Sequence, residues 1–114
     1  MSRRRKQLGQ LIRRELSELL QREVKDPRIK GIITITEVNL SPDLTQAKVF
    51  VSVMGSEQEK AETFEGLAAA SGFLRHELGE RLFLRRIPEL SFERDNSIEQ
   101  GGRVLELIEQ VARE

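Results

Sequence analysis

The chain has 114 residues, the length of one compact domain, and its 19 basic and 19 acidic side chains give a net charge of zero. It contains no cysteine, which excludes a disulfide framework, a thiolate nucleophile and a cysteine-based zinc site. Ser-Arg-Arg-Arg-Lys follows the first methionine without an apolar run, so we expect no signal peptide, no membrane contact and a cytoplasmic location.

The charges are distributed unevenly along the chain. Residues 1–30 carry ten basic and four acidic side chains, a net charge of +6, so the rest of the chain carries −6. Such a segment predicts a basic docking surface, since screening limits the influence of distant charges to about 8–10 Å. A solvated helix face with a frayed basic end explains the same pattern, and charge alone leaves both alternatives open.

Residues 5–25 are predicted to form the first helix, after a loose start at residues 1–4. Apolar residues recur there at spacings of three and four and form one stripe, which comprises Leu8, Leu11, Ile12, Leu16, Leu19, Leu20 and Val24. Pro27 ends the helix, because the residue before a proline is disfavoured in the α conformation. The opposite face carries the basic residues Arg13, Arg14, Arg22 and Lys25.

Two strands are predicted next, at residues 31–40 and 46–54. The first is rich in β-branched residues, and the second alternates between apolar and more polar positions. Residues 41–45 (Ser-Pro-Asp-Leu-Thr) between them have the composition of a turn. The two strands are therefore expected to form an antiparallel hairpin.

Helices are predicted at residues 57–71 and 73–84, with a join of small residues at 68–72 whose glycine could bend the axis. The inner stripe of the first is expected to comprise Ala61, Phe64, Leu67, Ala68 and Ser71, and that of the second Leu74, Leu78 and Leu82. A short strand follows at 90–94, and Ser97 is a suitable N-cap for a last helix at 98–113.

The order of elements is helix, strand, strand, helix, helix, strand and a C-terminal helix. It predicts one α+β domain that spans residues 1–114, with a three-stranded sheet and the helices packed on one face.

Motifs for catalysis are absent from the sequence. There is no phosphate-binding glycine loop, no dinucleotide fingerprint and no nucleophile elbow, and the only histidine, His76, has no partner at a suitable spacing. We therefore expect no enzyme, no cofactor and no metal site. The chain has five phenylalanines but neither tyrosine nor tryptophan, which disfavours recognition of single strands by stacking and favours contact with the backbone and shape of folded RNA.

The order α-β-β-α-α-β, with small residues between two helices, resembles the type II KH domain. Most KH domains carry a G-x-x-G loop at that join, whereas this chain has Ala70-Ser71-Gly72. The departure resembles the ribosome-binding factor A family, in which an Ala-x-Gly kink replaces the loop. Further blocks agree with that family in order along the chain, at residues 26–28, 34–44, 47–52, 72–75, 84–92 and 95–97.

The resemblance implies a monomeric assembly factor without catalytic activity. Such a protein binds the immature 30S ribosomal subunit at 16S ribosomal RNA near the neck. It assists late maturation of the ends of that RNA, is needed most in the cold, and is released by a GTPase.

Candidate RNA contacts combine the basic cluster with the family motifs. They are Arg3, Arg4, Arg5, Lys6, Arg13, Arg14, Lys48, Ala70, Ser71, Gly72, Arg75, Arg85 and Arg86. At three of these positions a structural role is an alternative to RNA contact. Ala70 and Gly72 could serve helix packing alone, and Arg75 could pair with a glutamate one turn away. The alternative function is a protein-interaction module whose basic first helix docks an acidic partner.

Overall fold

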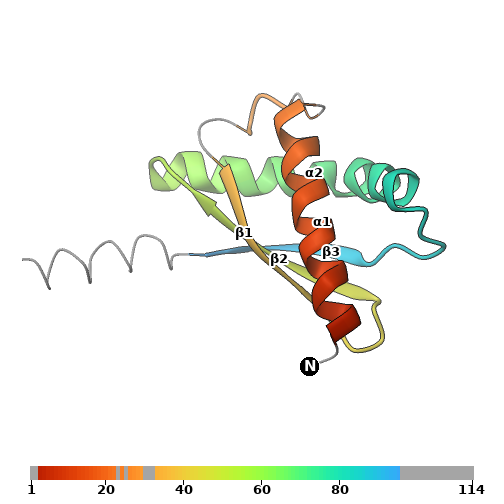
Figure 1. Cartoon of the computed structure of the whole chain (residues 1–114). Helices are drawn as coiled ribbons and strands as arrows, with labels where there is room; N and C mark the ends of the chain where they lie inside the picture. Colours follow the sequence, from red (N-terminus) through yellow and green to blue (C-terminus); the bar gives the residue numbers. More distant parts are fainter. Residues whose placement is uncertain (1–2, 23, 25, 30–32, 96–114) are drawn as a thin grey trace, which may run out of the picture.

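The computed structural model describes residues 3–22, 24, 26–29 and 33–95, so the C-terminal helix predicted at 98–113 lies outside the described residues. Within them the elements are α1 (Arg3–Arg22), β1 (Ile33–Leu40), β2 (Gln46–Val53), α2 (Glu57–Leu82) and β3 (Glu89–Arg94). The strands form one sheet in the order β1-β2-β3 (Figure 1). The predicted α+β class with a three-stranded sheet is confirmed.

The sheet combines antiparallel and parallel pairing. β1 and β2 form the predicted antiparallel hairpin, and the carboxylate of Asp43 ties their turn together by accepting hydrogen bonds from Ser41 and Thr45. β3 lies parallel to β2, with Val49 opposite Phe92. Parallel neighbours need a crossover connection, and α2 provides it.

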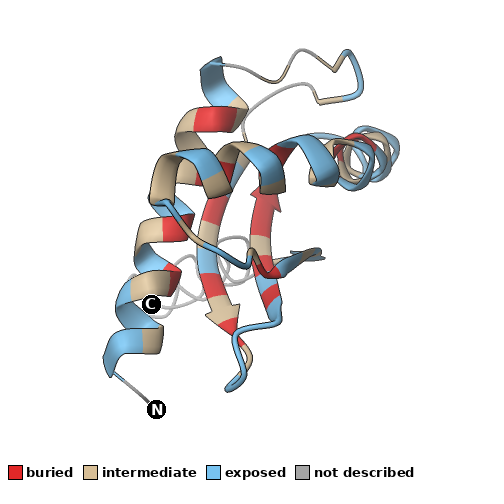
Figure 2. Cartoon of the chain, turned by 90° about the vertical axis from the view of Figure 1, so that its right-hand side faces the viewer, coloured by how far each residue is buried: buried red, intermediate tan, exposed pale blue. Residues whose placement is uncertain are grey.

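A single apolar core lies between the sheet and the two helices. α1 contributes Ile12, Leu16 and Leu19, all fully buried, as the spacing of its apolar residues predicts. The sheet and α2 complete the same cluster with Ile35, Val38, Leu40, Ala47, Val49, Val51, Val53, Leu67, Leu74 and Leu78. Because both helices bury residues in one cluster, they cover the same face of the sheet (Figure 2).

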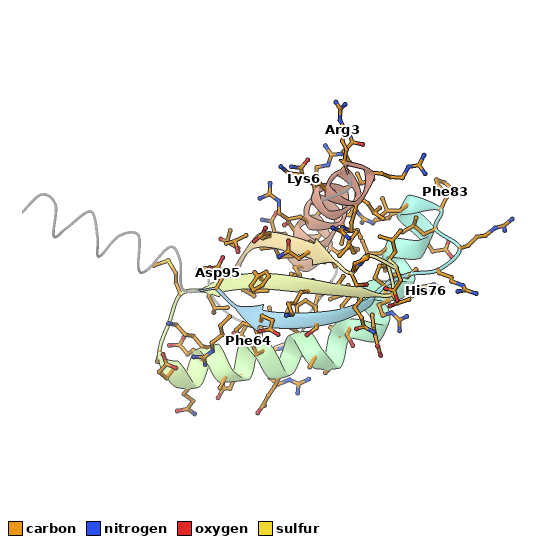
Figure 3. All side chains as sticks on the ribbon, turned by 90° about the horizontal axis from the view of Figure 1, so that it is seen from below. Arg3, Lys6, Phe64, His76, Phe83 and Asp95 are labelled. Carbon is orange, nitrogen blue, oxygen red and sulfur yellow. The ribbon has the colours of Figure 1, made fainter. Side chains whose placement is uncertain are left out.

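The prediction of two helices at 57–71 and 73–84 was wrong in one respect, because α2 is one continuous helix from Glu57 to Leu82. Gly72 lowers helix propensity but keeps helical hydrogen bonding possible, and it does not adopt a positive φ. The axis of α2 nevertheless changes direction within its length, as Figures 1 and 3 show. A capping box of Ser56 and Glu59 begins the helix.

The buried face of α2 also differs from the predicted stripe. Ala61 and Ala68 are exposed, whereas Thr63 and Gly66 are buried. The segment after α1 explains this difference, because Ile29 packs on Gly66 and Thr63 donates a hydrogen bond to the Arg28 carbonyl oxygen. A contact between segments so far apart in the sequence leaves no mark on local periodicity.

α1 begins at Arg3, so Arg3 and Arg4 belong to the helix rather than to a loose start. Among the described residues, no helix has the length and apolar character needed to cross a membrane.

Candidate nucleic-acid interface

A narrow cleft separates α1 from β1, which is an edge strand of the sheet. Its walls are Arg5, Lys6, Gly9, Gln10 and Arg13 on the helix and residues 36–40 on the strand. The cleft has a volume of about 190 Å³. Pockets for whole small molecules are larger, at about 300–1,000 Å³. The space suits a compact group such as a phosphate.

Two contacts fix the helix on the strand edge. Gly9 is buried against the carbonyl oxygen of Val38, with no room for a side chain between them. Four residues later, a guanidinium nitrogen of Arg13 donates a hydrogen bond of 3.3 Å to the carbonyl oxygen of Thr36. These contacts let α1 approach the backbone of β1 closely, which keeps the cleft narrow.

The cleft is basic on its helix side. Lys6 and Arg13 are exposed, and Arg5 is half-buried. Lys48 extends this positive region onto the outer face of the sheet, because it lies directly opposite Asn39 of the cleft in the β1-β2 register. Glu37 is the one acidic residue that lines the cleft, so cations predominate there.

The remaining predicted cations of α1 extend the same surface. Arg3, Arg4 and Arg14 are all exposed. Figure 3 shows Arg3 and Lys6 projecting from one end of the helix, away from the sheet. We call the exposed set Arg3, Arg4, Lys6, Arg13, Arg14 and Lys48 the basic edge.

The Ala-x-Gly segment lies on a different surface. α2 covers the inner face of the sheet, whereas Lys48 projects from the outer face, so the sheet separates Lys48 from Ala70, Ser71 and Gly72. Gly72 is exposed, and an added Cβ there would meet no other group within 4 Å. Close packing against the described residues therefore does not explain the small residue at this position.

Arg75 holds the loop between α2 and β3. Its guanidinium donates hydrogen bonds of 3.2 Å and 3.1 Å to the carbonyl oxygens of Pro88 and Ile87. It binds backbone rather than the glutamate that the helical spacing suggested, and it is only half-exposed. Arg75 therefore has a structural role, but one that differs from the predicted pairing with a glutamate. Arg85 and Arg86 of the same loop are exposed to solvent.

Arg28, next to α1, has a local structural role as well. Its guanidinium makes two hydrogen bonds to the Asp26 carboxylate, at 3.0 Å and 2.7 Å, and its backbone N–H makes a third. These hydrogen bonds lower the pKa of Asp26 to about 2. The contact fixes the turn around Pro27 and leaves Arg28 outside the basic edge.

Of the exposed apolar residues that the sequence analysis did not single out, Phe83 has the largest exposed fraction. Phe83 lies at the C-terminus of α2 and is 90% exposed. Its backbone is left-handed, with φ of 54°. No periodicity marks such a residue, because its position depends on where the helix ends.

In the described part of the chain, no group of three or more histidine or acidic side chains could hold a metal ion. His76 is exposed on α2, whereas Arg3 and Lys6 lie on α1 (Figure 3).

The family model for ribosome-binding factor A matches residues 4–108 of this chain. The chain belongs to the ribosome-binding factor A family. The ribosome-binding factor A of Acetivibrio thermocellus is 52% identical over 105 residues, which cover 92% of this chain and 85% of that protein. This family is one of ribosome-binding factors and not of enzymes, which agrees with the expectation that the chain is not an enzyme.

Solved structures of ribosome-binding factor A share the fold. The crystal structure from Thermus thermophilus is 29% identical, covers 79% of this chain and 93% of its own, and gives a TM-score of 0.70. A homology model of the Thermus thermophilus ribosome binding factor A, fitted into the cryo-EM map of a 30S complex, is 28% identical with a TM-score of 0.66. It covers 81% of this chain and 96% of its own.

Proposed function

We propose that this member of the ribosome-binding factor A family binds the immature 30S subunit through phosphates of 16S ribosomal RNA, which its basic edge contacts. The observation that carries the proposal is the cleft between α1 and β1, where Lys6 and Arg13 line a space of about 190 Å³. A phosphate fits this volume and charge, and the space is smaller than the pockets that hold drug-sized ligands. The 30S complex of the relative from Thermus thermophilus supports the choice of partner.

The basic edge would hold the RNA by non-covalent contacts alone, without catalysing a reaction. Lysine and arginine release counterions when they bind phosphates, so affinity falls as salt rises and the complex remains releasable. Binding that favours one RNA conformer over another shifts the population of conformers and needs no catalytic group. Arg3, Arg4 and Arg14 extend this contact along α1, and Arg5 supports it from within the cleft.

The proposal includes the finer role that the family resemblance implies. The protein acts as a cytoplasmic monomer with a KH-like fold, near the neck of the subunit. It assists late maturation and processing of the ends of 16S ribosomal RNA, with a part in cold adaptation, and a GTPase releases it. Ala70, Ser71 and Gly72 form a second RNA contact on α2, supported by the exposure of Gly72 without any internal packing.

Co-migration with ribosomal particles in a sucrose gradient tests the proposal. We expect the wild-type protein to migrate with small subunits at low salt and to dissociate at high salt. The double variant Lys6→Ala/Lys48→Ala should bind more weakly, because it removes two cations of the basic edge. The control Arg22→Ala/Lys60→Ala removes the same charge from the far end of α1 and from α2, and it should bind like wild type.

Two outcomes would contradict the proposal. Wild-type protein that stays at the top of the gradient at low salt would exclude the 30S subunit as partner. Equal binding by both double variants would show that total charge, not the basic edge, determines affinity. An acidic protein partner would instead appear as co-migration that survives digestion of the RNA.

A further inference from the structure

The C-terminus of α2 presents an aromatic ring to solvent. Phe83 is 90% exposed and adopts φ of 54°, a conformation in which helices usually place glycine or asparagine. Bulky residues are rare there, because the side chain crowds the backbone. Figure 3 shows the ring at the end of α2, pointing away from the sheet. Neither folding of the helix nor burial in the core accounts for phenylalanine at this position.

The loop after Phe83 is held firmly on the body of the protein. Arg75 binds the carbonyl oxygens of Ile87 and Pro88, and Pro88 is buried. The backbone N–H of Glu89 donates to the Thr45 carbonyl oxygen, which ties the loop to the β1-β2 turn. The backbone that carries the exposed side chains of this loop is therefore fixed in position.

Arg85 and Arg86 follow Phe83 closely in the chain, in the loop between α2 and β3. An extended chain spans at most about 3.5 Å per residue, so the Cα atoms of Phe83 and Arg85 lie within roughly 7 Å of each other. Both arginines line a depression of about 680 Å³ between this loop and the β1-β2 turn, where Leu44 is exposed. This volume lies in the range of sites that hold a nucleotide-sized ligand.

Two acidic residues also line the depression, and both already accept hydrogen bonds. Asp43 accepts from Ser41 and Thr45, and Glu89 accepts from Gln46 at 3.1 Å. Their carboxylates serve the turn and the strand pair, while Arg85 and Arg86 remain exposed to solvent.

We propose that Phe83, Arg85 and Arg86 form a contact for single-stranded RNA, in which an unpaired base stacks on the Phe83 ring and the arginines hold its flanking phosphates. Stacking on an exposed ring tolerates any base, and arginine suits phosphate in a bidentate geometry. The inference rests on the proposed function in taking RNA as the ligand. It adds a contact that is separate from the basic edge and specific for unpaired nucleotides.

Fluorescence of a short single-stranded RNA that carries 2-aminopurine tests the contact with the full chain. Stacking on Phe83 should quench the fluorophore on binding. Phe83→Leu keeps the apolar volume but removes the ring, and should weaken binding roughly 5- to 150-fold. Phe83→Tyr keeps the ring and should bind within about twofold of wild type. Arg85→Ala/Arg86→Ala should weaken binding and lower its salt dependence.

The variants distinguish the contact at Phe83 from the contacts of the basic edge. Unchanged quenching and affinity in Phe83→Leu would overturn the proposal, as would an equal loss of affinity for a matched RNA duplex in Phe83→Leu. If Phe83→Leu bound the oligomer as tightly as Phe83→Tyr, the affinity would not depend on the aromatic ring, and stacking as the source of binding would be refuted. Co-migration of Phe83→Leu with small subunits reports on the proposed function separately, because the basic edge is intact. Thermal unfolding confirms that each variant is folded.

Discussion

Gly9 of α1 lies so close to Val38 of β1 that an added Cβ would stand 2.7 Å from the Val38 carbonyl oxygen. Real Cβ atoms essentially never approach another group within 3.0 Å, and neither partner here is a flexible side chain. Gly9 therefore sets the distance between helix and strand, and with it the width of the cleft that Lys6 and Arg13 line.

Gly9→Ala should destabilise the protein although alanine favours helices. Helix propensity alone would raise the free energy of unfolding by about 1 kcal/mol. The clash with the Val38 carbonyl must push α1 away from β1, and overpacking of this kind costs about 1–3 kcal/mol. Urea denaturation followed by circular dichroism measures the net change in the free energy of unfolding. A variant more stable than wild type would refute the close contact.

Gly72→Ala is the matched comparison, because an added Cβ at that position meets nothing within 4 Å. We expect the free energy of unfolding to rise by about 0.5–1 kcal/mol, since the same propensity gain meets no clash. If RNA approaches the backbone of α2 at Gly72, this stabilised variant binds small subunits more weakly. Higher stability with wild-type affinity would remove Gly72 from the RNA contacts.

Arg75→Lys tests the structural role of Arg75. Lysine cannot reproduce the fork that binds two carbonyl oxygens, so the loop before β3 loses at least one hydrogen bond. We expect a loss of about 1–2 kcal/mol in the free energy of unfolding. Arg86→Lys, at an exposed position of the same loop, should leave stability unchanged. Equal stability of the two variants would show that Arg75 does not hold the loop.

The Asp26–Arg28 pair predicts a specific acid dependence. The pKa of Asp26 is about 2 in the folded chain against an ordinary value of 3.8, chiefly because of its hydrogen bonds from Arg28. A lowered pKa stabilises the folded chain above pH 3.8, and this contribution is lost as the pH falls toward 2. NMR titration of the Asp26 carboxyl in Arg28→Ala should show the pKa returning toward 3.8. A pKa near 2 in that variant would exclude Arg28 as the cause, and Arg22→Ala serves as the control.

Most of the fold could be predicted from local patterns. Leu16 and Leu19 fall on a helical stripe, and Val49 and Val51 alternate along a strand, because burial imposes the period of the element. The turn at Asp43 followed from side-chain chemistry that acts within five residues. What the sequence did not predict depends on contacts between distant segments, such as the burial of Gly66 under Ile29.

For the candidate site, too, local patterns could be read from the sequence, whereas contacts between distant segments could not. The cations of α1 could be identified from charge alone, but their position against Asn39 and Lys48 required the register of the sheet. The role of Gly9 depends on the strand edge beside it, which the local sequence does not show. Arg75 binds backbone carbonyl oxygens, whereas Arg85 of the same region is exposed to solvent. Both are arginines near one loop, so only the tertiary structure distinguishes their roles.

The slope of binding against salt tests the central claim, contact of the basic edge with RNA phosphates, most directly. The equilibrium constant for small subunits would be measured across a series of salt concentrations for wild type, Lys6→Ala/Lys48→Ala and the control Arg22→Ala/Lys60→Ala. Each lost phosphate contact should reduce the slope of log K against log salt by about 1, so we expect a decrease of about 2 for the first variant alone. Identical slopes for all three proteins would contradict the account.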